Sequence, residues 1–332
     1  MPSAQPAPPD FALSGLPPVP DYEDLFRPEL SAIRQALASA LSPEGFHPEV
    51  MSTQTTDTPD AVNRLWQALR YASLGGGKRI RPVILLTCGQ ACGAPLPALL
   101  PTAAAIEMVH AQSLIHDDLP CMDDDDLRRG QPTLHKAFDE ATAVLAGDAL
   151  LALAFHQIGA TPGVPAEALL SVIRDFAAVA SMGGLVNGQY IDMQCEGQAY
   201  DATTLEYIHR NKTGALFRFS ARAGAMLAGA SRPVTDALTI WGEQLGLAFQ
   251  IVDDLLDIEA SSETLGKTAG KDSLQEKATY PALYGIESSH QKAAELIAAC
   301  AATLDLPTLN GLCAGHRENL KAITHYIGCR IH

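Results

Sequence analysis

The amino-acid sequence predicts an all-α fold in which one helical domain covers residues 21–332. Apolar residues make up 47% of the 332 residues and aromatic residues only 6%, a composition that favours packed helices over a β-sandwich. Apolar residues also recur at three- and four-residue spacing in several long segments, and alternating apolar and polar runs are almost absent. The length allows one large core or two ordinary domains. The continuous helical pattern favours the single domain.

Glycine and proline residues separate the predicted helices. The expected helices cover residues 61–74, 99–119, 141–158, 169–182, 205–228, 237–258, 280–304 and 317–330. Residues 1–20 are rich in proline and lack the basic start and apolar run of a signal peptide, so we expect a disordered lead-in. No unbroken apolar stretch reaches membrane-spanning length, and we therefore expect no transmembrane segment.

Charge and cysteine content narrow the function further. The formal net charge of −15 argues against a broad nucleic-acid surface. The seven cysteines include no CxxC pair, which is typical of reduced thiols in a cytoplasmic protein. Cys88 and Cys92 are four residues apart in a helical stretch, and we expect both in the core.

The strongest local signal is an acidic run, HAQSLIHDDLPCMDDDDLRRG, from His110 to Gly130. Asp117 and Asp118 end a helical apolar stretch, and the proline at position 120 then loosens or breaks the helix. Asp123 begins four consecutive aspartates. Six carboxylates within ten residues repel one another unless cations neutralise them. Taken alone, such a run is more often a solvated surface than a binding site.

A second acidic cluster, FQIVDDLLDI, changes that interpretation. Asp253 and Asp257 are one turn apart on one helix face. With Asp254 they stand among large apolar residues, so we expect that not all three reach solvent, and buried carboxylates need partners. Mg²⁺ prefers a few carboxylates together with water and phosphate oxygens. The two clusters therefore predict metal ions clamped around a diphosphate. Neither has the glycine-centred spacing of a Ca²⁺-binding EF-hand loop.

Basic residues that suit phosphate accompany the acidic clusters. Residues 75–82, GGGKRIRP, place three positive charges after a glycine turn at a helix start, where amide groups and arginines bind phosphate oxygens well. The spacing is not that of a P-loop. A second basic pair and three isolated lysines follow: Arg128, Arg129, Lys212, Lys267 and Lys277. Each alone is more often a solvated side chain, but together with the aspartates they indicate subsites for two diphosphates.

His110 lies seven residues before Asp117, about two turns away on the same helix face. A lone helical histidine is more often structural. Its alignment with the acidic cluster makes a phosphate contact credible, and we do not interpret it as a general base.

Together these motifs resemble the trans-prenyl (isoprenyl) diphosphate synthases, particularly the farnesyl and geranylgeranyl diphosphate synthases. The resemblance runs from about Leu65 to the C-terminus through GGGKRIRP, SLIHDDLPCMDDDDLRRGQPTLH, LAGDALL, GQYIDM, HRNKTGALFR, FQIVDDLLD and TLGKTAGKD. It implies one large helical bundle around a central cavity (the isoprenoid synthase type I fold) and a homodimer. It also implies an activity, the joining of isopentenyl diphosphate to an allylic diphosphate with Mg²⁺, three ions being bound with substrate.

The resemblance also implies roles for individual residues. Asp117, Asp123 and Asp253 would ligate Mg²⁺, supported directly or indirectly by Asp118, Asp254 and Asp257. The positions that hold isopentenyl diphosphate match Lys78, Arg81, His110 and Arg129. Arg128 matches the position that grips the allylic diphosphate, whose site is lined by Lys212, Thr213, Gln250 and Lys267.

The implied mechanism follows from charge. Mg²⁺ and the basic groups stabilise the departing pyrophosphate, so that the allylic C–O bond ionises. The double bond of isopentenyl diphosphate attacks the cation, and loss of a proton completes the step. The catalytic set would be Asp117, Asp118, Asp123, Asp253, Asp254 and Lys212. Dipoles of the backbone at residues 212–213 and of Gln250 would face the cation, and no nucleophilic side chain is needed.

Product length is expected to depend on Gln112 and Ser113, five and four residues before Asp117. In the family that this chain resembles, residues here form the floor of the hydrophobic tunnel. Many bacterial farnesyl synthases carry an aromatic ring at the Gln112 position, which closes the tunnel at fifteen carbons. We expect the smaller glutamine to be flexible and able to admit a twenty-carbon product, whereas KTGALFR and the aspartates at 124–125 are more typical of farnesyl synthases. Both products stay open.

Two other functions are compatible with parts of the pattern. A class I terpene cyclase is also helical, but it would carry an Asn/Ser/Glu metal motif in place of Asp253-Asp254-Leu255-Leu256-Asp257 and would need no second phosphate pocket. A catalytically silent partner of another synthase would not need intact acidic and basic motifs. The sequence therefore favours an active prenyltransferase.

Overall fold

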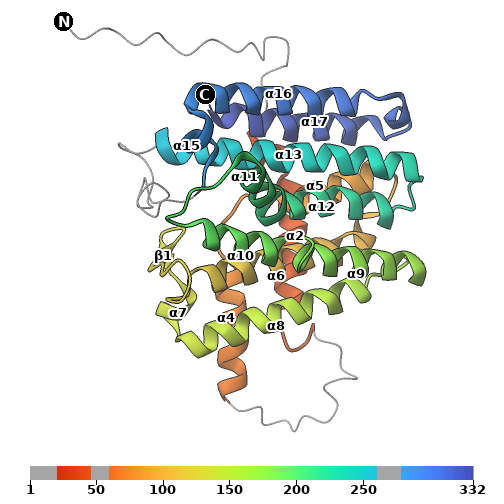
Figure 1. The fold of residues 1–332 in the computed structure, drawn as a ribbon. Coiled ribbons are helices and arrows are strands. Elements are labelled where there is room, and N and C mark those ends of the chain that lie inside the picture. Colours follow the sequence, from red (N-terminus) through yellow and green to blue (C-terminus); the bar gives the residue numbers. More distant parts are fainter. Residues whose placement is uncertain (1–20, 46–59, 260–277, 332) are drawn as a thin grey trace, which may run out of the picture.

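A computed structural model describes residues 21–45, 60–259 and 278–331 of the chain. The predicted lead-in, residues 1–20, lies outside the described residues, as do Lys267 and Lys277. The prediction of an all-α fold is confirmed. Apart from one short hairpin, the described chain is helical (Figure 1).

The long helices of the first half are α2 (Arg27–Ala40), α4 (Asp60–Leu74), α5 (Ile80–Ala91), α6 (Leu100–Asp117), α8 (Glu140–Gly159), α9 (Ala166–Ala180) and α10 (Leu185–Cys195). Those of the second half are α11 (Ala202–Ile208), α12 (Gly214–Leu227), α13 (Arg232–Glu259), α16 (Ile286–Leu304) and α17 (Ala314–Gly328). Short helical pieces are α1 (Tyr22–Leu25), η1 (Leu96–Ala98), α7 (Leu134–Ala137), η2 (His209–Thr213), α15 (Tyr280–Tyr284), η3 (Pro307–Leu309) and η4 (Cys329–Ile331).

The predicted helix at 205–228 is present, but five residues in its middle adopt π-helical turns. The segment η2, His209–Thr213, separates α11 from α12. The predicted helix at 280–304 is likewise broken at Gly285, whose φ of 82° is favoured by glycine. The sequence analysis also did not anticipate α10. The only strands among the described residues are β1 (Leu127–Arg128) and β2 (Gln131–Pro132), an antiparallel pair.

The core of the bundle runs from α1 to α17. Figure 1 shows α8, α9 with α10, α12, α13 and α16 with α17 as successive tiers, and α6 passing behind them. Nearly every residue of α6 between Thr102 and Val109 is fully buried, because α6 packs against α8, α5 and α2 at once. The hairpin and the C-terminal end of α13 lie on the same side of the bundle (Figure 1).

Two described segments are apolar enough to be compared with membrane spans. Glu140–Gly159 and Ala166–Cys195 pass a test of length and composition alone, which our sequence analysis did not foresee. In the fold, α8 packs against α6 and α9, and α9 packs against α12. Their apolar residues thus divide between the core and an exposed face that is described below.

Glycines let the central helices approach one another closely. A Cβ atom at Gly224 of α12 would lie 2.5 Å from the carbonyl oxygen of Leu85 and 2.9 Å from the amide nitrogen of Gly89, both in α5. A Cβ atom at Gly246 of α13 would lie 2.8 Å from Gly214 Cα in α12. These backbone atoms cannot move aside without separating the helices.

Replacing Gly224 with alanine should therefore destabilise the protein by about 1–3 kcal/mol, since overpacking forces the α5 and α12 backbones apart. Gly159→Ala is the matched control, because nothing lies within 4 Å of the added Cβ and alanine favours the helix. Chemical denaturation of the two variants measures the difference. Equal stability of the two variants would contradict the close approach.

Candidate active site

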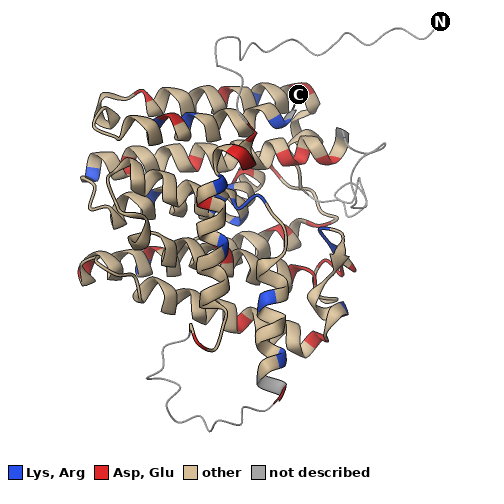
Figure 2. Ribbon diagram, turned by 180° about the vertical axis from the view of Figure 1, so that it is seen from behind, with Lys and Arg blue, Asp and Glu red and all other residues tan. Residues whose placement is uncertain are grey.

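A cavity of about 950 Å³ lies among the turn before α5, α6, α10, η2 and α13. Most of the residues predicted for the site line it: Lys78, Arg81, His110, Gln112, Ser113, Asp117, Arg128, Arg129, Lys212, Thr213, Gln250 and Asp253. Asp118, Asp123, Asp254 and Asp257 are not part of its wall. In Figure 2, the acidic end of α13 and the charged loop after α6 lie along one side of the bundle.

Asp117 is the last residue of α6, and the chain then folds back over the helix end. The amide of Asp123 donates to the Asp117 carbonyl oxygen at 2.8 Å, so the proline at position 120 ends the helix as predicted. Burial raises the pKa of the Asp117 carboxyl to about 6, an effect that Asp123 and Asp118 reinforce and Lys212 opposes. The site thus holds a negative charge that its own residues do not fully compensate.

Asp118 holds the hairpin in place. Its carboxylate is 3% exposed and accepts from Nε of Arg128 at 2.9 Å and from Nη2 of the same guanidinium. Arg128 also donates to Asp125 Oδ2 at 3.2 Å. Asp118 thus positions Arg128, which lines the cavity.

The three carboxylates of the second cluster differ in exposure, and, as expected, not all of them reach solvent. Asp253 is exposed, and its Oδ1 lies 3.1 Å from Nη2 of Arg330. Asp254 is buried and turned away from the cavity, where it accepts from Nε2 of Gln250 at 2.8 Å and from the Tyr280 amide at 3.0 Å. Asp257 is intermediate in exposure. Asp254 thus bonds to a residue of the cavity wall, Gln250, without lining the cavity itself.

The basic turn is fixed to α6 by Arg79. Its guanidinium forms a buried ion pair with Glu107 and also donates to the carbonyl oxygens of Ser73 and Gly75. The backbone of Arg79 is left-handed, with φ of 49°. Arg79 thus fixes the turn from which Lys78 and Arg81 reach the cavity wall.

The second basic segment meets the first at this turn. Arg129 donates to the carbonyl oxygen of Gly76, and a side chain at Gly77 would collide with the Arg129 guanidinium. Lys78 lies 5.1 Å above the ring of Tyr326, and Arg81 lies 4.8 Å above the ring of Phe217, contacts that orient both cations.

Charge gathers around His110. Burial and four nearby arginines, Arg81, Arg129, Arg79 and Arg128, hold the pKa of His110 well below its usual value, so the ring is neutral near pH 7. Burial lowers the pKa of Arg81 to about 10, and Arg81 stays cationic. Its Nε atom is buried without a partner among the described residues. The arginines around His110 therefore make this part of the cavity strongly positive and leave a hydrogen-bond donor available, as an anion site requires.

Another part of the cavity wall is formed by η2 and α10. Lys212 Nζ donates to Asp192 Oδ2 at 2.6 Å. Burial lowers the pKa of Lys212, but Asp192, Asp117 and Asp123 outweigh it and raise the pKa overall. Thr213 donates to Gln250 Oε1 at 2.6 Å, which links η2 to α13. A Cβ atom at Gly188 would overlap the backbone of Lys212, so glycine permits α10 to approach η2.

Several residues of the site were not assigned from sequence. Arg330 lines the cavity, pairs with Asp253 and lies 4.8 Å above the ring of Phe249. Gln189 lines it with a buried Oε1 that has no partner among the described residues. The signal for Gln189 was available in the GQYIDM motif. Arg330 stands 77 residues from Asp253, and no local pattern marks it.

The carboxylates of the two acidic clusters would supply only part of the ligands of an Mg²⁺ ion. Among the described residues, no three His, Cys, Asp or Glu side chains converge closely enough to hold an ion. The donor set nevertheless fits, because Mg²⁺ takes one or two carboxylates and completes its shell with water and phosphate oxygens. A cation beside Asp117 would also compensate the charge that burial disfavours.

Comparison with known proteins shows to which family the chain belongs. A sequence model of the polyprenyl synthetase family matches residues 62–305. A farnesyl diphosphate synthase of Geobacillus stearothermophilus is 48% identical over 233 residues, 70% of this chain and 78% of that protein. A chloroplastic geranylgeranyl pyrophosphate synthase of Capsicum annuum is 47% identical over 232 residues, 69% of this chain and 63% of that protein. The crystal structure of an apo FPP/GFPP synthase from Zymomonas mobilis has a TM-score of 0.76 and 34% identity, covering 92% of this chain and 99% of that one.

The chain therefore belongs to the polyprenyl synthetase family. It is a prenyltransferase of isoprenoid biosynthesis with the all-α fold of those enzymes. The resemblance drawn from the motifs is confirmed.

Asp117→Asn should stabilise the metal-free protein more at pH 7.5 than at pH 5. The folded-state pKa is raised from 3.8 to about 6, so the contribution of protonated Asp117 is complete below about pH 4 and is lost as the pH rises through about 6. Above that pH the variant gains about 1–2 kcal/mol because it removes a poorly solvated charge. Thermal unfolding in EDTA measures this gain at both pH values.

The exposed Glu295→Gln is the control, and we expect it to show no such pH dependence. A gain from Asp117→Asn that is as large at pH 5 as at pH 7.5 would exclude the buried charge as its cause.

Proposed function

We propose that the cavity binds isopentenyl diphosphate and an allylic diphosphate side by side and joins them head to tail into a short-chain trans-prenyl diphosphate. The product would have fifteen or twenty carbons, as in the farnesyl and geranylgeranyl synthases to which the chain is similar. One observation carries this proposal. A single cavity is lined both by a cluster of arginines and by carboxylates of both acidic clusters, Asp117 and Asp253.

The residues divide into two phosphate subsites. Lys78, Arg81 and Arg129 surround the neutral His110 and supply donors for the diphosphate of isopentenyl diphosphate. Arg128 and Lys212 flank Asp117 and serve the allylic diphosphate. Two separate cationic groups favour the synthase over a class I terpene cyclase, which ionises a single diphosphate.

Mg²⁺ would be held by Asp117, Asp123 and Asp253, with Asp118 and Asp257 near them, and would neutralise the charge that develops on the departing pyrophosphate. As the family resemblance implies, three Mg²⁺ ions would be bound together with substrate. Lys212 and Arg128 add hydrogen bonds to the same leaving group, which favours ionisation of the allylic C–O bond. The Oε1 atom of Gln250, already fixed by Thr213, directs a negative dipole toward the cavity.

The hydrocarbon end requires a dry, apolar wall. Leu114, Met122, Leu185, Met193 and Leu216 line the cavity beyond the charged groups. They exclude water that would otherwise trap the carbocation. The closely placed double bond of isopentenyl diphosphate can then react with the cation before solvent does.

Asp117→Ala and Asp253→Ala should each lower turnover with Mg²⁺ by roughly a hundredfold or more, because each removes charge that holds the leaving group. The assay incubates purified protein with Mg²⁺, isopentenyl diphosphate and each allylic starter, and it identifies products by chain length. Asp236→Asn, an exposed aspartate on α13, should leave turnover unchanged.

The same assay separates the alternatives. Wild-type protein that releases a cyclic hydrocarbon would support a terpene cyclase, and protein that is inactive alone would support a silent partner subunit. Turnover of Asp117→Ala or Asp253→Ala within a few-fold of wild type would refute the metal clamp.

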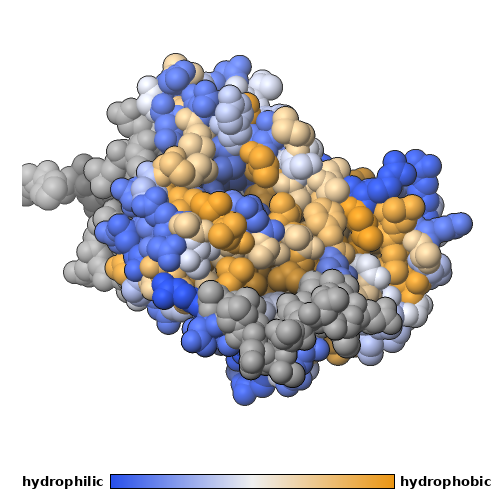
Figure 3. Space-filling model, turned by 90° about the horizontal axis from the view of Figure 1, so that it is seen from below, coloured by the Kyte–Doolittle hydropathy of each residue, from blue (hydrophilic) through white to orange (hydrophobic). Residues whose placement is uncertain are grey.

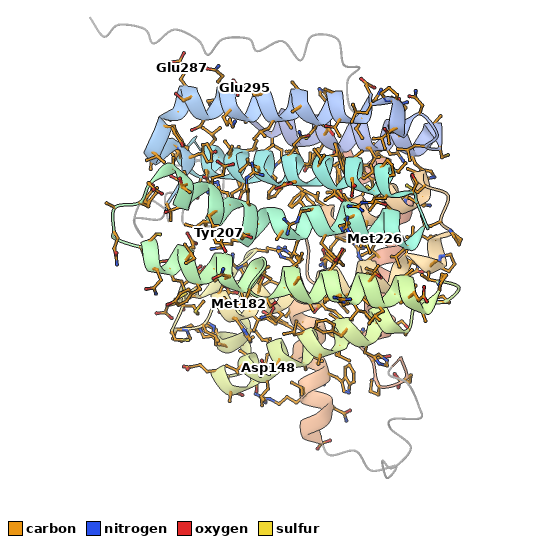
Figure 4. All side chains as sticks on the ribbon, turned by 45° about the vertical axis from the view of Figure 1, so that its right-hand side comes forward. Asp148, Met182, Tyr207, Met226, Glu287 and Glu295 are labelled. Atoms are coloured by element: carbon orange, nitrogen blue, oxygen red, sulfur yellow. The ribbon has the colours of Figure 1, made fainter. Side chains whose placement is uncertain are left out.

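We also propose that the protein is a homodimer. Large apolar side chains are exposed on α8 to α11: Val144 (41%), Leu145 (58%), Leu170 (58%), Met182 (70%), Val186 (51%), Tyr190 (58%) and Tyr207 (39%). Figure 3 shows hydrophobic side chains gathered on the face seen from below, and Figure 4 labels Met182, Tyr207 and Asp148 along the bundle. Val186 and Tyr190 also line the cavity, so a second copy would complete its wall.

The seven free cysteines support a cytoplasmic location.

Leu145→Glu should convert the dimer to monomers, since a charge would replace an apolar contact in each copy. Sedimentation velocity at micromolar concentration measures the mass. Ile240→Glu, on α13 and 49% exposed, is the matched control and should leave the dimer intact. A monomeric wild-type protein would disprove the proposal.

A further inference from the structure

Two side chains of α6, Gln112 and His116, form the floor of the cavity. Both line it. One turn further from Asp117, Met108 and Val109 are fully buried and take no part in its wall. Glu107 and His110, on another face of α6, do line the cavity, but on the face of Gln112 and His116 its wall ends at Gln112. A hydrocarbon that extends along this face would meet the Gln112 side chain.

Gln112 is held in place by His116 and is only 9% exposed. Its Nε2 lies 3.1 Å from His116 Nδ1. On the other side of the ring, His116 Nε2 lies 3.3 Å from the carbonyl oxygen of Val144 in α8. A carbonyl oxygen only accepts, so Nε2 carries the ring proton and Nδ1 accepts from the Gln112 amide. Gln112 therefore has a hydrogen-bond partner one turn along its own helix, a contact that the sequence did not reveal.

Gly147 keeps the ring at this position. A side chain at Gly147 would overlap the His116 ring, so the imidazole occupies the space that this glycine leaves on α8. The ring is thus enclosed by α6 and α8 and bonded to both. This contact gives the LAGDALL motif a place in the site, although Gly147 itself does not line the cavity.

We propose that His116 is a positioning residue that sets product length by holding Gln112 across the end of the cavity. Without the ring acceptor, the buried Gln112 amide must turn to another partner, and its side chain leaves the floor. A growing chain could then extend further before elongation stops. The inference rests on the proposed function, because only an elongating enzyme has a product length to set.

The test compares product lengths made by wild type, His116→Phe, Gln112→Met and the double variant. Phenylalanine keeps a ring beside Gly147 but removes both hydrogen bonds, and methionine keeps the length of glutamine but has no donor. Each single variant should raise the ratio of longer to shorter product roughly fivefold, the factor that one typical buried hydrogen bond produces in a two-way partition. The double variant should match the singles, since both act on one contact.

His325→Phe, which replaces a histidine of α17 outside the cavity wall, is the control and should leave the ratio unchanged. Gln112→Met carries the test if His116→Phe does not fold. An unchanged product ratio in an active His116→Phe or Gln112→Met enzyme overturns the role of His116 alone. Absence of any prenyl diphosphate from wild type overturns the proposed function and this inference with it.

A second measurement does not depend on activity. Nitrogen-15 NMR of histidine-labelled protein should show the Nε2–H tautomer for His116, assigned by its loss in His116→Phe. The Nδ1–H tautomer would contradict the hydrogen-bond order and overturn the proposal.

Discussion

The buried ion pair between Arg79 and Glu107 ties the basic turn to α6, and much of the site depends on that connection. Glu107 is 3% exposed, and an unpaired charge there would cost about 3–5 kcal/mol. The pair therefore fixes the distance between the turn that carries Lys78 and Arg81 and the helix that carries His110 and Asp117. The single helix α6 thus relates the basic turn, the first acidic cluster and the cavity floor.

Most of the charged side chains at the cavity have a partner of opposite charge or a neutral neighbour. The arginines gather around a neutral His110, and the carboxylates are distributed among separate partners: Asp118 with Arg128, Asp192 with Lys212, and Asp253 with Arg330. Burial still raises the pKa of Asp118, and it raises the pKa of Asp117 to about 6. A diphosphate with its cations would complement both halves at once, because each half alone carries charge that its surroundings do not balance.

Irregular backbone conformations occur in the segments around the cavity. The π-helical turns of η2 set Lys212 and Thr213 against α10 and α13, and such insertions in helices often occur at functional sites. Arg79, Asp124 and Arg129 adopt positive φ without being glycine. These conformations are maintained by contacts distant in sequence, such as Arg129 with Gly76.

The sequence by itself determined the helical class, the family and most residues of the site, because helical periodicity and motif spacing are local properties of the chain. It could place Asp117 near the end of one helix and Gln250 within another. It could not show that Asp254 turns away while Asp253 pairs with Arg330, or that Gln112 is anchored through His116 to α8. Those outcomes depend on which helix packs against which, and only the tertiary structure decides the direction in which side chains on neighbouring positions of one helix point.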